Sequence, residues 1–156
     1  MKIMKLNLKF LILGMLALIS ISGCQMEADK AKEADKVAME YIRAYIDMDT
    51  KQLNDLSYKT YDFGPDKVGN PGASKKLGSK YELYRYELDG KKNEYYYKVV
   101  YYDPVEDKKL RESLYILQDK NGAWKNSEWA WGSTHNLDSI VGSKEPKHVH
   151  KWGEGE

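Results

Sequence analysis

Side chains that could carry out covalent catalysis are scarce in this sequence. The chain holds one cysteine, Cys24, and three histidines. Nucleophilic catalysis needs a nucleophile, a base and an orienting group that converge in space. Ser133, His135 and Asp138 are of the right types, but near neighbours in a C-terminal tail rarely converge as a triad. We therefore expect no catalytic triad.

A metal site has only one candidate. His148 and His150 form an H-x-H pair, and His135 precedes them by a short stretch. Metal sites need several His, Cys or carboxylate ligands in fixed geometry. An H-x-H pair in an exposed terminal tail is more often solvated, so we predict no metal and no cofactor.

Carboxylates that could act as general acids or bases lie on strand-like runs. A catalytic carboxylate would have to sit inside an apolar cavity, whereas each of these also fits a solvated face of a sheet. None stands out by its position, and we predict that the protein is not an enzyme. They are Glu82, Glu87, Glu94 and Glu112.

Binding chemistry fits the composition better, because the chain has 13 tyrosines and four tryptophans against two phenylalanines. These rings offer apolar area together with a hydroxyl or indole donor, as interaction surfaces and glycan-binding walls do. The alternative is that most of them fill the core of a small β-sheet. The candidate ligand- or partner-binding residues are Tyr84, Tyr86, Tyr95, Tyr97, Tyr101, Trp129 and Trp131.

The N-terminal segment reads as a secretory signal. Lys2, Lys5 and Lys9 precede an apolar stretch over 10–21, and Ser22 and Gly23 follow it. A basic region, an apolar region and small residues before a cleavage site define such a signal. The apolar stretch is shorter than the roughly 20 residues that a transmembrane helix needs.

The end of that segment, Ile21-Ser22-Gly23-Cys24, resembles the lipobox of bacterial lipoproteins. The resemblance implies that the thiol of Cys24 takes a diacylglyceryl group and that the chain is cleaved just before it. An ordinary secretory signal is the alternative. It would leave one unpaired thiol on a secreted protein, which invites intermolecular pairing.

The charge balance excludes two kinds of partner. The signal takes three of the 25 basic residues and none of the 24 acidic ones, which leaves 22 against 24 in the mature chain. Nucleic-acid binding needs a clustered basic face, and electrostatic binding to a membrane surface needs a polybasic segment. We expect neither. No disulfide can form within the mature domain.

The elements that would position these residues begin after a lipidated tether over 24–33. An apolar stripe predicts an amphipathic helix that ends near Met48. Asp49 or Thr50 can then cap a second short helix, and a loop covers 57–80. The stripe comprises Ala34, Val37, Ala38, Tyr41, Ile42, Tyr45 and Ile46.

Four strand-like runs follow, with Asp89-Gly90, Asp103-Pro104 and Asn121-Gly122 between them. Such short turns favour an antiparallel meander, and one face of that sheet must be covered by the first helix. The domain thus spans 34–131, and a C-terminal tail over 132–156 is expected to be partly disordered. The expected strands are 81–88, 94–102, 110–118 and 123–131.

The fold class is therefore α+β, with a helix packed on a four-stranded sheet. The segment Ala38–Leu56 resembles the opening of the nuclear-transport-factor-like (cystatin-like) superfamily, in which an amphipathic helix ends near an Asp and a second helix begins with leucines. The resemblance covers about 34–131. It implies a cone-like curved sheet, often with a pocket, whereas the short helices and the long loop leave a plainer helix-on-sheet fold as the alternative.

These observations predict a lipoprotein anchored to the cell membrane through Cys24 and facing the extracytoplasmic side. It would act as a binding or protein-interaction module toward an envelope protein or a cell-wall component. A small-molecule pocket of the isomerase or dehydratase kind, with an inward carboxylate, is the alternative.

Overall fold

The computed structural model of the chain describes residues 4–60, 64–127 and 136–155, with residues 4–25 described for their backbone only. The chain divides into two compact units, Met1–Glu33 and Ala34–Glu156. Helix α1 covers Met4–Asp47 and so contributes to both units. Within the residues so described, no helix combines the length and apolarity needed to cross a membrane.

In the second unit, α1 buries a narrow stripe. Ala34, Ala38, Ile42 and Ile46 are all buried, as their four-residue spacing predicts. Tyr45, predicted to lie on the same stripe, is instead half exposed. The reason is that Tyr45 is not one of the residues at four-residue spacing that face the sheet, and it lies to one side of them on the helix surface.

The chain reverses direction directly after α1. Met48 adopts a positive φ of 50°, and Asp49 then caps helix α2, Thr50–Leu56, with its Oδ1 accepting from the backbone N–H of Gln52 at 2.9 Å. The predicted short helix is thus confirmed, and of the two predicted caps, Asp49 or Thr50, the structure has Asp49.

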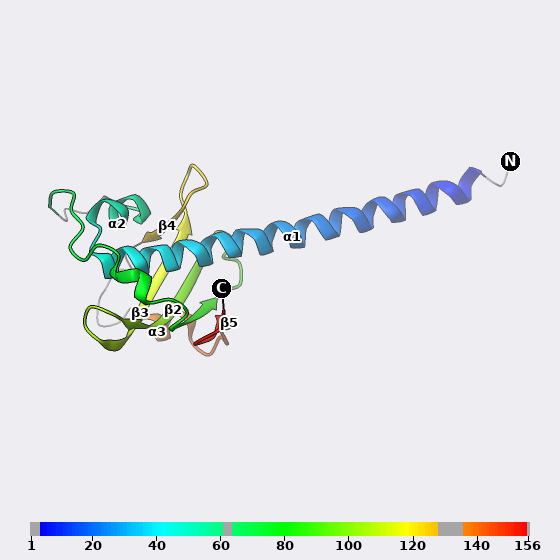
Figure 1. Cartoon of the computed structure of the whole chain (residues 1–156). Coiled ribbons are helices and arrows are strands. Elements are labelled where there is room, and N and C mark those ends of the chain that lie inside the picture. Colours follow the sequence, from blue (N-terminus) through cyan, green and yellow to red (C-terminus); the bar gives the residue numbers. More distant parts are fainter. Residues whose placement is uncertain (1–3, 61–63, 128–135, 156) are drawn as a thin grey trace. The chain divides into compact units, whose positions relative to one another are not determined.

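The sheet has five strands in the order β4-β3-β2-β1-β5, and every neighbouring pair is antiparallel. The second unit's part of α1 lies over one face (Figure 1). The predicted α+β class with a helix packed on an antiparallel sheet is therefore confirmed. The strands are β1 Tyr81–Tyr86, β2 Glu94–Asp103, β3 Lys108–Gln118, β4 Trp124–Ser127 and β5 Lys147–His150.

The prediction of four strands was wrong, because β5 pairs with the open edge of β1. Its four residues follow a proline and show no apolar alternation, so no local signal indicated a strand. Pairing with β1 supplies the backbone hydrogen bonds that hold these residues as a strand. The cone-like shape implied by the family resemblance is not confirmed. Residues 128–131 of the predicted fourth strand lie outside the described residues.

Strand β2 is covered on both faces, as its two apolar faces predict. Tyr95, Tyr97, Val99 and Tyr101 are buried on the face toward α1. On the other face, Tyr96 is buried in a cluster with Tyr86, Leu137 and Val141. The last two belong to helix α3, Leu137–Val141, in the predicted tail.

The long loop before the sheet is tied to the end of α1. Asp47 accepts hydrogen bonds from the backbone N–H and the hydroxyl of Ser74, both at 2.8 Å. Ser74 belongs to a short 3₁₀ helix, η1, Ala73–Lys76. The side-chain amide of Asn70 donates to the carbonyl oxygen of Ile46 at 3.2 Å. These bonds fix the loop against the helix end, which is where a pocket forms.

Candidate functional site

Most of the predicted binding tyrosines lie in the core. Tyr86, Tyr95, Tyr97 and Tyr101 are buried, so they support the sheet and offer no contact surface. Only Tyr84, of the five that the structure describes, is partly exposed. The other two candidates, Trp129 and Trp131, lie outside the described residues.

A buried ion network joins α1 to the sheet. The guanidinium of Arg85, whose residue is 3 % exposed, donates to Asp35 Oδ2 at 2.6 Å and to Glu87 Oε1 at 3.0 Å. The hydroxyl of the buried Tyr97 donates to the other oxygen of Asp35 at 2.8 Å. Both carboxylate oxygens of Asp35 are therefore used, and the register between helix and sheet is fixed.

The protonation states in this network follow from burial and charge. Burial opposes the charge on Arg85, but its hydrogen bonds to Asp35 and Glu87 outweigh that effect and raise the pKa of the guanidinium. Burial, and then the negative charge of Asp35, raises the pKa of the Tyr97 phenol. Arg85 therefore stays charged and Tyr97 neutral across the physiological range.

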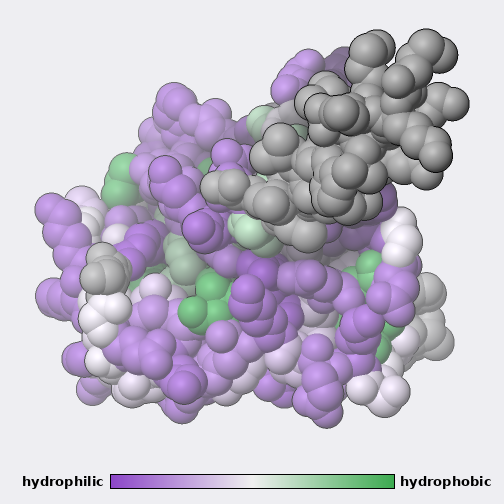
Figure 2. Space-filling model, turned by 90° about the vertical axis from the view of Figure 1, so that its right-hand side faces the viewer, coloured by the Kyte–Doolittle hydropathy of each residue, from purple (hydrophilic) through white to green (hydrophobic). Residues whose placement is uncertain are grey.

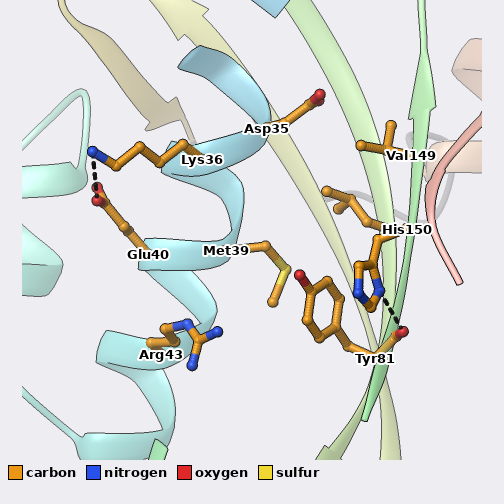
Figure 3. A pocket seen from close by; sticks show the side chains of 9 residues that line it. Asp35, Lys36, Met39, Glu40, Arg43, Tyr81, Val149 and His150 are labelled. Carbon is orange, nitrogen blue, oxygen red and sulfur yellow. Dashed lines mark hydrogen bonds and ion pairs between the residues drawn. The ribbon is translucent and has the colours of Figure 1, made fainter. Parts of the chain in front are cut away.

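A groove of about 480 Å³ runs beside this network. We call it the α1–β5 groove, because α1, β1 and β5 form its walls. In Figure 3, Met39 points from α1 toward the rings of Tyr81 and His150. Lys36 and Glu40 form an ion pair of 3.6 Å on the helix. The groove is lined by Asp35, Lys36, Met39, Glu40, Arg43, Tyr81, Leu83, Val149 and His150.

Stacking of two rings forms one wall of the groove. The rings of Tyr81 and His150 lie parallel with their centroids 3.8 Å apart, and His150 Nδ1 lies 3.1 Å from the carbonyl oxygen of Tyr81. His150 Nε2 lies 3.2 Å from the carbonyl oxygen of Glu154. Sequence reasoning missed this wall because it placed His150 in an unordered tail.

A second ring stack lies on the opposite face of the sheet. His148 stacks on Tyr84 at 4.3 Å, and the ammonium of Lys98 lies 4.3 Å from the same ring. A register shift between Leu83 and Tyr84 directs the two histidines to opposite faces. Within the described chain, no group of three or more His, Cys, Asp or Glu side chains is placed to hold a metal ion.

A second pocket, of about 350 Å³, lies at the C-terminal end of α1. We call it the Tyr45 pocket. Its walls come from α1, α2, the loop that holds Lys67 and Asn70, and the turn between β2 and β3. Tyr45, Met48 and Val105, which line it, are among the exposed large apolar side chains of the domain. Such clustering of exposed apolar groups is typical of a binding site.

One carboxylate on the sheet faces α1. Glu112 pairs with Val99 in the β2–β3 register and so shares its face, and burial raises the pKa of this carboxyl. No described residue forms a hydrogen bond or ion pair with it. Neither of the two pockets above is lined by Glu112.

Polar residues dominate the face of the molecule shown in Figure 2, where hydrophobic groups appear only as small separate spots.

The remaining predicted residues are not placed by the structure. Ser133 and His135 lie outside the described residues, and the side chain of Cys24 is not described. Asp138 lies on α3, where its carboxylate is 3.7 Å from Arg111.

No protein-family model matches this chain, and no curated protein or solved structure is significantly similar to it.

Proposed function

We propose that this protein is a lipoprotein, anchored to the cell membrane through a diacylglyceryl group on Cys24 and facing the extracytoplasmic side. Its domain acts by binding another protein of the envelope, not by catalysis. The lipobox-like ending and the single cysteine support the anchor. Two acyl chains meet the requirement for stable attachment without any contact from the protein itself.

The observation that carries the binding role is the α1–β5 groove. Its floor is apolar, with Met39 and Leu83 buried beside the Tyr81–His150 stack. Its rim carries charges of both signs on Lys36 and Glu40. An apolar floor inside a polar rim is the usual anatomy of a protein interface, and it suits a chain segment that inserts one apolar side chain between charged neighbours.

Contacts within the domain hold both walls of the groove. Asp35, at its edge, is held by both Arg85 and Tyr97, and the Tyr81–His150 stack fixes the opposite wall. Binding to a preorganised surface loses less conformational entropy, which favours affinity.

Site-specific photocrosslinking in intact cells tests this proposal. A photoreactive benzoylphenylalanine replaces the exposed Lys36 on the rim, and, as the control, Lys120 in the turn between β3 and β4. We expect one reproducible envelope protein to crosslink at position 36 and not at position 120. Glu40→Lys should abolish that crosslink, whereas Glu145→Lys, at an exposed position outside the groove, should not.

Identical crosslinks from both positions, or none from position 36, would refute the groove as the interface.

The family to which the domain belongs is a separate question. We propose that the domain is a distant member of the nuclear-transport-factor-like superfamily. The order of a helix, a short capped helix, a long loop and an antiparallel sheet supports this assignment.

The second candidate is small-molecule binding beside Glu112, whose carboxyl lies on the α1 side of the sheet, outside the two pockets described above. A half-buried carboxyl with a raised pKa is the group that an isomerase or dehydratase would use as an acid or base. If this candidate is correct, Glu112→Gln should abolish binding of a small molecule that the unaltered protein binds. The crosslink at position 36 should persist in the same variant.

A further inference from the structure

The Tyr45 pocket contains a buried carboxylate that the groove proposal does not use. Asp103 is 5 % exposed and lines the pocket. Its Oδ1 accepts from the backbone N–H groups of Val105 at 2.7 Å and Glu106 at 3.2 Å. Among the described residues, no cation lies within ion-pair distance of Asp103, and nothing donates a hydrogen bond to Oδ2.

A buried carboxylate without a cation is costly, because transfer out of water disfavours its charge. Two backbone N–H groups offset part of this cost at one oxygen only. The other oxygen has capacity for a cation that enters the pocket. Charged side chains in the pocket lining comprise the two carboxylates of Asp103 and Glu106 and the one ammonium of Lys67, so the lining is net negative.

Aromatic rings line the same pocket. Tyr41 and Tyr45 come from successive turns of α1, and Tyr45 is 50 % exposed. The face of a tyrosine ring attracts a cation within about 6 Å of its centroid. The exposed side chains of Met48 and Val105 add apolar area beside these rings. Carboxylate, aromatic faces and methyl groups together favour a cation with an apolar shell over a hydrated metal ion.

We propose that the Tyr45 pocket binds a small organic cation, an amine or quaternary ammonium with a short apolar portion. Asp103 Oδ2 neutralises its charge, and the rings of Tyr41 and Tyr45 contact its alkyl groups. A volume of about 350 Å³ lies in the range of small-molecule sites. The site is separate from the α1–β5 groove, so either proposal can fail alone.

Isothermal titration of the full-length chain in detergent tests the proposal with four probes: tetramethylammonium, choline, phenethylamine and cadaverine. The control is 3,3-dimethyl-1-butanol, the neutral isostere of choline. We expect at least one cation to bind saturably, and choline to bind at least tenfold more tightly than its isostere. The same affinity for both would show that charge plays no part and would overturn the proposal. Absence of saturable binding by all four cations would overturn it as well.

Variants locate the site. Asp103→Asn keeps an oxygen to accept the two backbone N–H bonds and removes only the charge, so it should weaken cation binding at least tenfold. Tyr45→Leu should also weaken it, whereas Tyr58→Leu, at another exposed tyrosine outside the pocket lining, should not. Circular dichroism and the melting midpoint confirm that each variant is folded. Unchanged cation affinity in folded Asp103→Asn would place the site elsewhere and refute the assignment.

Discussion

The ion pair of Asp35 and Arg85 joins α1 to the sheet through two largely buried side chains. Its two partners lie 50 positions apart in sequence, and their side chains are 14 % and 4 % exposed. Removing one partner of a buried pair leaves an uncompensated charge, whereas removing both costs far less. The difference between these two cases is measurable.

Asp35→Ala should therefore lower the free energy of unfolding by about 3 kcal/mol, near the lower end for a broken buried pair because Glu87 still contacts Arg85. The double variant Asp35→Leu, Arg85→Met should recover part of that loss, because the buried hydroxyl of Tyr97 still lacks its acceptor. Urea denaturation measures both. Asp55→Ala, which breaks the exposed pair with Lys51, is the control and should change stability little. Equal effects of Asp35→Ala and Asp55→Ala would contradict this prediction.

Glu112 makes stability depend on pH. Burial raises the pKa of this carboxyl in the folded state, so the folded state binds its proton more tightly than the unfolded state does. Below the unfolded pKa both states are protonated and the group has no effect. As pH rises through the unfolded pKa toward the folded value, the folded state is destabilised.

Glu112→Gln should accordingly raise the melting midpoint at pH 7, and the gain should shrink as pH falls toward 4. Thermal unfolding followed across this pH range tests the prediction. Glu145→Gln, at an exposed position, should show no such trend. A stabilisation by Glu112→Gln that does not vary with pH would mean that charge burial is not its cause.

At the scale of elements, β5 covers an edge that would otherwise be open. It pairs with β1, and the stacks of His150 on Tyr81 and His148 on Tyr84 hold it on both faces. An open edge presents unpaired N–H and C=O groups that template pairing with another chain. A short strand of weak intrinsic preference can therefore have a large effect on solubility.

Deleting 147–156 should expose the β1 edge, lower the melting midpoint and cause self-association. Light scattering and analytical ultracentrifugation measure the change, with deletion of 155–156 as the control that keeps β5. A monomeric deletion variant with an unchanged melting midpoint would show that β5 contributes neither stability nor edge protection.

At the scale of the whole molecule, the proposed anchor and the domain are separable. The domain holds its own core within Ala34–Glu156, and no cysteine other than Cys24 exists for a disulfide. Its folding should thus be independent of lipidation.

Cys24→Ala should abolish incorporation of a palmitate analogue and move the protein from the membrane fraction to the soluble fraction, with an unchanged circular dichroism spectrum. Gly23→Ala keeps a small residue before the cysteine and should be lipidated normally. A Cys24→Ala protein that still takes up the lipid label would refute the anchor. Full rescue of a null strain by the soluble form would show that anchoring is not needed for function.

The amino-acid sequence by itself determined the elements whose signals are local. The four-residue spacing of Ala34, Ala38, Ile42 and Ile46 predicted the helix, because helical periodicity is visible within one continuous segment of the sequence. Asp49-Thr50 predicted a cap at one of these two residues, and Asp89-Gly90 and Asn121-Gly122 predicted the tight turns, for the same reason. Alternation along 94–102 predicted a central strand with apolar groups on both faces.

Only the tertiary structure decided which of these residues are accessible. Tyr84 and Tyr97 are the same residue type on adjacent strands, yet one is partly exposed and the other is fully buried beneath Asp35. Strand β5 and the stack of His150 on Tyr81 depend on a partner about 70 positions away. Burial and edge pairing are long-range properties, set by the segments that pack together, and so no local pattern could determine the groove, the pocket or the fifth strand.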